Sequence, residues 1–130
     1  MKLFKSFFSL SFLLISIACH SQSDKLLDCK ILHNVKLKYA DAPNRNDFVV
    51  INDNKHIEYL KNGTYYIKSD LNWINECEYN ATMTEITLPN FPYKVGEVMN
   101  VKFDKIENGK VYGIATVRGL KSVVNFELIN

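Results

Sequence analysis

An alternation of apolar and polar residues constrains the fold of this chain more than any other feature. It has a period of two, begins near Lys30 and runs to the C-terminus. In the stretch 64–73, for example, Tyr65, Ile67 and Trp73 fall on one side, with polar residues between them. Successive side chains of an extended chain point to opposite faces, so this period is typical of a half-buried β-strand. No window after residue 18 has the 3.6-residue period of an amphipathic helix. We therefore expect an all-β protein.

Turn-forming residues divide the alternation into about eight short strands. Asn62-Gly63 and Asn108-Gly109 are strong hairpin signals, because these residues tolerate the positive φ angles of a two-residue turn. Strands are expected at residues 31–39, 48–51, 56–60, 64–73, 77–88, 98–106, 111–118 and 122–129. Strands joined by successive short hairpins favour a meander. We expect a small antiparallel barrel or sandwich with lipocalin-like meander topology.

The first 18 residues have the pattern of an export signal. Lys2 and Lys5 form a short positive region, and an apolar run interrupted only by serine extends from Phe7 to Ala18. This run is too short to cross a bilayer, which needs about 20 apolar residues. Residues 1–18 are therefore predicted to be a secretory signal peptide.

The end of this segment resembles the lipobox of bacterial lipoproteins, in which a small residue precedes a cysteine. Here the pair is Ala18-Cys19. The resemblance implies that Cys19 becomes the lipidated first residue of the mature protein, anchored to a membrane of the bacterial cell envelope. The alternative is an ordinary signal peptide cut after Ser21 or Gln22, which would give a soluble periplasmic or secreted protein. Residues 19–28 are expected to form a tether, and residues 29–130 a single β-domain.

Two cysteines remain if Cys19 carries a lipid. An exported chain enters an oxidising compartment, where disulfides persist. An even remainder then suggests one bridge between Cys29 and Cys77. In the chain-entropy model, closing so long a loop contributes about 4 kcal/mol to stability. The alternative is a pair of buried free thiols.

The charge of the mature chain argues against one class of partner. The whole chain has 16 Lys and Arg residues against 14 Asp and Glu residues. Residues 1–18 contribute Lys2 and Lys5 and no acidic residue, so the expected mature chain has no formal net charge. Nucleic-acid-binding domains usually carry a basic excess. We therefore expect no nucleic-acid partner.

The residues that commonly carry catalysis form no recognisable constellation. His20, His33 and His56 lack the spacing of metal ligands, and no nucleophile or phosphate-binding motif occurs. Glu76 and Glu78 flank Cys77 and are expected to lie on an exposed polar face. We expect no metal, no cofactor and no enzymatic activity.

The aromatic residues are the strongest candidates for a binding site. Most of them are expected to face inward. Tyr65, Trp73, Tyr79 and Phe103 are the candidate contacts for a small apolar ligand, because a barrel can enclose a cavity lined by such side chains. Simple core packing is the alternative for these residues. The inward-facing set comprises Tyr39, Phe48, Tyr59, Tyr65, Trp73, Tyr79, Phe103 and Phe126.

Three elements of the chain resemble a group of short exported proteins of Bacteroidetes-type bacteria, which are uncharacterised lipoproteins or secreted proteins. These elements are Cys29, the W-x-x-x-C-x-Y segment Trp73–Tyr79 and the segment Tyr93–Met99. Asn34 departs from the pattern, which has a glycine before the first strand. The resemblance implies an envelope location and a small β-fold, and it favours pairing of Cys29 with Cys77. It implies no known activity.

Two functions follow as expectations, with an enzyme as a third and weaker one. The first is a non-catalytic envelope lipoprotein or secreted β-domain that acts through protein–protein interaction with an envelope partner. The alternative is a lipocalin-like carrier that holds a small apolar ligand in an aromatic-lined barrel. A cavity would favour the carrier. A filled interior with an exposed apolar patch would favour the interaction module.

Overall fold

The computed structural model describes residues 27–42 and 44–129. The predicted signal peptide, Cys19 and most of the predicted tether lie outside these residues. Within the described residues no helix has the length and apolar character needed to cross a membrane. The elements are a short 3₁₀-helix η1 (Lys30–His33) and strands β1 (Asn34–Tyr39), β2 (Phe48–Asn52), β3 (Lys55–Leu60), β4 (Tyr65–Asn75), β5 (Glu78–Ile86), β6 (Val98–Glu107), β7 (Lys110–Val117) and β8 (Leu120–Ile129).

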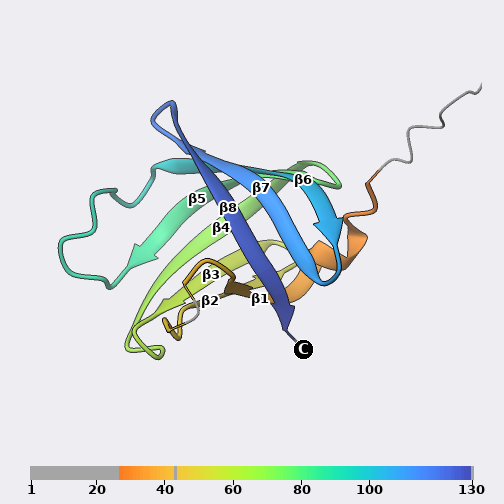
Figure 1. Ribbon diagram of the computed structural model, residues 1–130. Helices are drawn as coiled ribbons and strands as arrows, with labels where there is room; N and C mark the ends of the chain where they lie inside the picture. Colours follow the sequence, from red (N-terminus) through yellow and green to blue (C-terminus); the bar gives the residue numbers. More distant parts are fainter. Residues whose placement is uncertain (1–26, 43, 130) are drawn as a thin grey trace, which may run out of the picture.

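The eight strands form a closed antiparallel barrel in chain order (Figure 1). Each strand pairs with the next, and β8 returns to pair with β1 through contacts such as Phe126 opposite Tyr39. The predicted all-β meander is confirmed, and the structure decides for a barrel over a sandwich. Closure also leaves no free edge strand in the sheet, which removes a route to aggregation.

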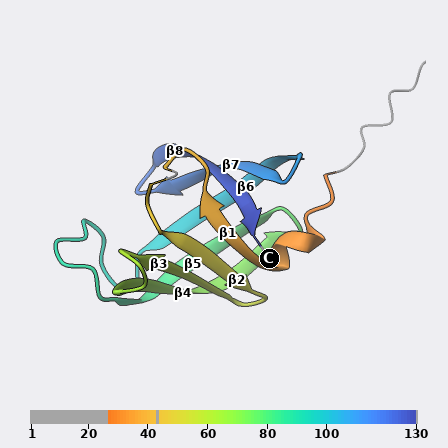
Figure 2. The ribbon, with the colours of Figure 1, turned by 60° about the horizontal axis from the view of Figure 1, so that its bottom comes forward.

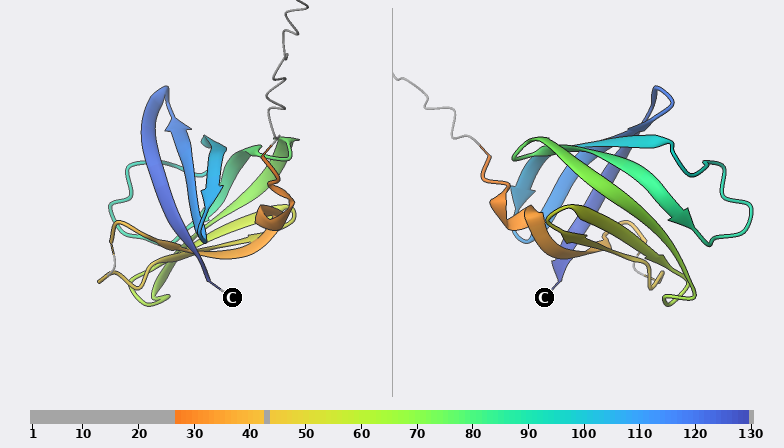
Figure 3. Two further views of the ribbon diagram at one scale, coloured as in Figure 1. Left: turned by 45° about the vertical axis from the view of Figure 1, so that its right-hand side comes forward. Right: turned by 180° about the vertical axis from the view of Figure 1, so that it is seen from behind.

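The barrel has two different ends. At the helix end lie η1 and the turns β2–β3, β4–β5 and β6–β7. At the loop end lie the β1–β2 connection, the turns β3–β4 and β7–β8, and the long β5–β6 loop of residues 87–97. Figures 1 and 2 show η1 on the right and the β5–β6 loop on the left, and Figure 3 shows the same separation from behind. The two ends are therefore built by different segments.

The hairpin signals mark real turns. Asn108 and Gly109, with φ angles of 52° and 75°, connect β6 to β7 as predicted. Gly63 lies in the β3–β4 turn after two further residues with positive φ. Gly113 has a different role: a Cβ added there would lie 2.6 Å from the carbonyl oxygen of Lys102, so β6 and β7 need glycine at this close approach.

The first strand begins later than predicted. Ile31 was expected to open it, but it lies in η1 and is 55% exposed. The preceding Cys29 and the following Leu32 are fully buried at the helix end of the barrel. A 3₁₀ turn brings both of these side chains inward, whereas an extended chain would separate them onto opposite faces.

Two aromatic residues point the opposite way from the prediction. Phe48 and Tyr59 are neighbours on β2 and β3, and their rings stack on the outside of the barrel with centroids 4.8 Å apart. Lys36 lies over the outer face of the Phe48 ring. The inward positions of these strands belong instead to Val49 and Ile51 on β2 and to the residues that alternate with Tyr59 on β3.

Candidate ligand-binding site

The interior of the barrel contains space as well as side chains. A cavity of about 200 Å³ lies in the loop-end half, and a pocket of about 40 Å³ lies deeper. His56, Glu58, Met99 and Ala115 line both of them, so the two spaces meet at these residues. A cavity of roughly 150 Å³ can hold benzene, whereas drug-sized ligands occupy roughly 300–1,000 Å³. The space suits a ligand slightly larger than benzene.

The walls of the larger cavity, here called the loop-end cavity, are mainly apolar and come from β4 to β8 and the β5–β6 loop. Polar groups come from β3, from Ser69 on β4 and from Ser122 on β8. A mainly apolar wall with few polar groups is the usual composition of a small-molecule site. The lining residues are His56, Glu58, Ile67, Ser69, Met83, Phe91, Tyr93, Met99, Ala115, Val117, Leu120 and Ser122.

The mouth of this cavity is held in place by contacts across the loop end. Phe91 and Tyr93 in the β5–β6 loop pack edge to face, with ring centroids 5.5 Å apart. The guanidinium of Arg118 lies 5.2 Å from the centre of the Tyr93 ring and donates two hydrogen bonds to Glu97. These hydrogen bonds hold the pKa of the Glu97 carboxyl below its usual range. The loop is thus connected to the β7–β8 turn, and the two aromatic rings are kept at the rim.

His56 contributes a neutral polar group to the interior. It is 5% exposed, and its Nδ1 shares a hydrogen bond of 2.8 Å with the Tyr79 hydroxyl. Burial lowers the pKa of His56 to about 4, because the charged imidazolium would lose its hydration. At neutral pH the ring is therefore uncharged, with one nitrogen bonded to Tyr79. Burial also raises the pKa of the Tyr79 hydroxyl, so both partners stay neutral.

Glu58 places a carboxyl group two residues further along β3, on the same inner face. The Tyr39 hydroxyl donates a hydrogen bond of 2.6 Å to its Oε1. Burial raises the pKa of the Glu58 carboxyl, and the Tyr39 hydrogen bond opposes that shift. Arg45 also lowers this pKa through its charge, but its guanidinium is bonded to Asp47. Among the described residues, no cation forms an ion pair with Glu58.

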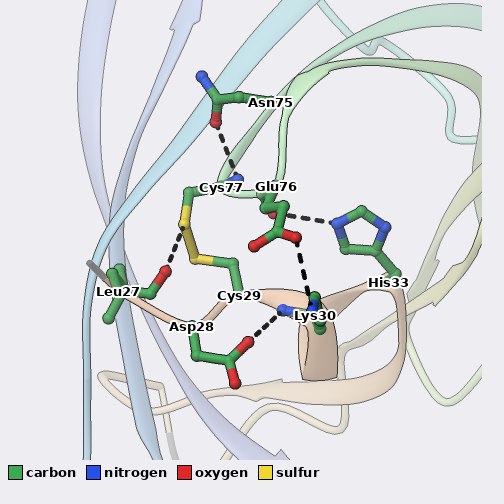
Figure 4. Close-up of a disulfide and its surroundings, with 8 residues drawn as sticks. All are labelled: Leu27, Asp28, Cys29, Lys30, His33, Asn75, Glu76 and Cys77. Carbon is green, nitrogen blue, oxygen red and sulfur yellow. Dashed lines mark hydrogen bonds and ion pairs between the residues drawn. A yellow bond between two sulfur atoms is a disulfide. The ribbon is translucent and has the colours of Figure 1, made fainter. Parts of the chain in front are cut away.

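The helix end is closed. Figure 4 shows the Cys29–Cys77 disulfide joining the segment before η1 to the β4–β5 turn, with the two Cα atoms 5.2 Å apart. The predicted bridge is therefore present. Beside it, His33 Nε2 donates a hydrogen bond of 3.0 Å to the Glu76 carbonyl. The His33 ring stacks on Trp73, with the ring centroids 3.6 Å apart. These contacts lock η1 across the end of the barrel.

The four aromatic residues predicted as ligand contacts do not gather at one place. Tyr79 lines the deeper pocket and packs edge to face against Phe103, which belongs to the buried core. Trp73 lies at the helix end, where it contacts His33. Tyr65 packs on the apolar cluster of the loop-end half, outside the lining of the loop-end cavity. Their role as ligand contacts stays a prediction.

Sequence reasoning missed the two polar residues that reach the interior from β3. In the sequence, His56 lacks the spacing of metal ligands and Glu58 belongs to no motif. A signal was available in the alternation, because His56 and Glu58 share a face with Leu60. The opposite face of β3 carries Ile57 and Tyr59, which are more apolar, so the alternation alone favours that face as the inner one. Only the pairing of His56 with the buried Ile51 on β2 decides between the two faces.

The described residues contain no group of three or more His, Cys, Asp or Glu side chains that could hold a metal ion. The glutamates beside Cys77 have other contacts. Glu76 lies 4.0 Å from the Lys30 ammonium, and Glu78 accepts a hydrogen bond of 3.0 Å from Asn100. Glu76 is exposed, as expected, whereas Glu78 is partly buried.

Comparison of the chain with known protein families, with curated proteins and with solved structures finds no match. The site is therefore interpreted from its own geometry.

Proposed function

We propose that this protein is an exported, lipid-anchored envelope protein that binds a small, mainly apolar ligand in the loop-end cavity. The observation that carries the proposal is the cavity itself, about 200 Å³ in volume, with mainly apolar walls and a few polar groups, of which His56 and Glu58 also line the deeper pocket. A domain whose only task is to present its outer surface has no need of such a space, since packed interiors are more stable. Of the two functions expected from the sequence, we therefore prefer the carrier of a small ligand to the protein–protein interaction domain.

The apolar rim supports ligand entry from the loop end. Leu120 lines the cavity and is 68% exposed, and the rings of Phe91 and Tyr93 stand beside it. The competing function, protein–protein interaction, has weaker support. Ile114 and Val123 are cross-strand neighbours with exposed side chains on the outer face of β7 and β8. Two exposed apolar residues are ordinary on a soluble protein.

Native mass spectrometry of the protein isolated from its own host tests the binding function. We expect the wild-type protein to carry a recurrent bound small molecule. Ala115→Leu should lose it, because the larger side chain occupies the junction of the two cavities. Thr116→Leu, one residue further on β7 and on the outer face, is the matched control and should retain the molecule. Wild-type protein that consistently carries no ligand would contradict the proposal.

The envelope location is tested separately at the lipidation site. The disulfide supports export, because such bonds persist outside the reducing cytosol. Cys19→Ser should release the protein from the membrane fraction and abolish labelling with a fatty acid, whereas Ser21→Ala should change neither. If Cys19→Ser remains in the membrane fraction, the lipid anchor is wrong, and the ligand proposal is unaffected.

A further inference from the structure

The polar and apolar side chains that line the loop-end cavity are not evenly distributed. Phe91, Tyr93 and the exposed Leu120 supply apolar surface at its mouth, and Ser122 is a further exposed lining residue. The carboxyl group of Glu58 and the neutral imidazole of His56 line the cavity where it meets the deeper pocket. The buried Ser69 adds a hydroxyl on β4. A ligand that fills this space therefore has its apolar part toward the rim and its polar part toward Glu58 and His56.

Among the described residues, no cation forms an ion pair with the carboxyl group of Glu58, although the charge of Arg45 acts on it. Tyr39 is its hydrogen-bond donor, through Oε1. Arg45 is bonded to Asp47, whose second carboxylate oxygen accepts the backbone N–H of Lys61 at 2.9 Å. The Glu58 side chain is partly buried, and a carboxylate taken out of water without a cation beside it is unfavourable. A positively charged group on the ligand would supply the missing partner.

The surroundings of Glu58 favour a cation further. Tyr79 and Phe126 line the deeper pocket together with Glu58. Tyr39 lines it too, but the Arg45 guanidinium already lies over its ring, 5.9 Å from the ring centre. The faces of aromatic rings attract cations. The described residues that line the two spaces include no lysine or arginine, which would repel a cation. An anion would meet an unfavourable carboxyl group at the same place.

We infer that the ligand is a small amine, with an ammonium group that pairs with Glu58 and an apolar body that fills the loop-end cavity. This inference rests on the proposed function and narrows the class of ligand. Benzylamine, benzyl alcohol and benzoate are suitable probes, because they share a ring of the size that the cavity accepts and differ in the charge of one group.

Isothermal titration calorimetry of the wild-type protein with each probe gives the first test. Benzylamine should bind more tightly than benzyl alcohol, by about tenfold or more, because hydrogen bonds to charged groups are stronger than neutral ones. Benzoate should bind weakest. If benzyl alcohol or benzoate binds as tightly as benzylamine, the amine inference is wrong while the binding function stands. If none of the three binds, the loop-end cavity is not a site for ligands of this size, and the proposed function fails with it.

Glu58→Gln gives the second test, in the same titrations. It should remove most of the preference for benzylamine and leave the affinity for benzyl alcohol nearly unchanged. Glu85→Gln is the matched control, because Glu85 also accepts a tyrosine hydroxyl hydrogen bond, from Tyr66, but on the outside of the barrel. An unchanged preference in folded Glu58→Gln would overturn the assignment of Glu58. If Glu58→Gln does not fold, the comparison of the three probes on the wild-type protein still decides.

Discussion

The two halves of the barrel differ in how completely they are filled. In the helix-end half, Tyr79 is 1% exposed and Phe103 is 2% exposed, and the disulfide and η1 close the end. In the loop-end half, a cavity of about 200 Å³ opens toward an apolar rim. The difference suggests a division of roles within one small domain. Packing at the helix end supplies stability, and the loop end can therefore keep an unfilled space for binding.

The largest expected effect comes from the disulfide at the helix end. The double substitution Cys29→Ser and Cys77→Ser should lower the free energy of unfolding by about 4 kcal/mol, because a long loop is no longer closed in the unfolded chain. Urea denaturation measures this change. A loss of less than about 1 kcal/mol would show that the disulfide is not a main source of the stability of the barrel.

A matched pair of leucines compares the two ends directly. Leu32 is fully buried in the helix-end half, and Leu120 is exposed at the rim of the cavity. Leu32→Ala should cost about 3 kcal/mol of stability through lost burial and the space left behind. Leu120→Ala should cost less than about 0.5 kcal/mol. If the two substitutions lowered the free energy of unfolding equally, in thermal or urea unfolding, the proposed division of roles between the two halves would be wrong.

The interior polar groups should make stability depend on pH. The folded-state pKa of His56 is about 4, below its ordinary value of 6.5. Between these values the unfolded chain takes up a proton that the folded chain does not, so stability is lost as the pH falls from 6.5 to 4. His56 alone accounts for about 2 to 3 kcal/mol of this loss.

His56→Gln should therefore lose less stability than the wild type between pH 7 and pH 4 in urea denaturation. Glu58 has a raised pKa and acts in the opposite direction, but its effect is present in both proteins and cancels in the comparison. An identical decline in the two proteins would mean that His56 is not buried in its neutral form.

The last pair of substitutions should change stability in different directions in the two halves. Ala115 lines the cavity, whereas Ala81 is fully buried in the packed core. Ala115→Leu should leave stability unchanged or raise it by up to about 1 kcal/mol, because it fills empty space. Ala81→Leu should lower stability by about 1 to 3 kcal/mol through overpacking. The same sign for both would show that the loop-end half is as tightly packed as the other.

Much of the fold could be predicted because its signals are local. The alternation around Ile67 marks a strand, and Asn108-Gly109 marks a turn whatever the rest of the chain does. The pairing of Cys29 with Cys77 was also accessible, because few cysteines remain once Cys19 is assigned. These inferences use neighbours in sequence or simple counting.

The candidate site could not be predicted in the same way. On β3 both faces contain apolar side chains, so the inward direction of His56 depends on its partner Ile51 on another strand. The cavity depends on the summed volume of side chains from several strands, which no single segment reveals. The start of β1 was displaced for a related reason, because the burial of Leu32 at the barrel end outweighs the alternation around Ile31.

The division between a closed half and a ligand-accessible half is tested most directly by NMR of the protein labelled with ¹³C at its methionine methyl groups. After Met1, the methionines of the chain are Met83 and Met99, and both line the loop-end cavity. Trp73, the single tryptophan, reports on the helix end. Titration with benzylamine should shift both methyl signals until they saturate and leave the Trp73 indole N–H signal in place. Unmoved methyl signals, or an indole signal that moves with them, would contradict this division.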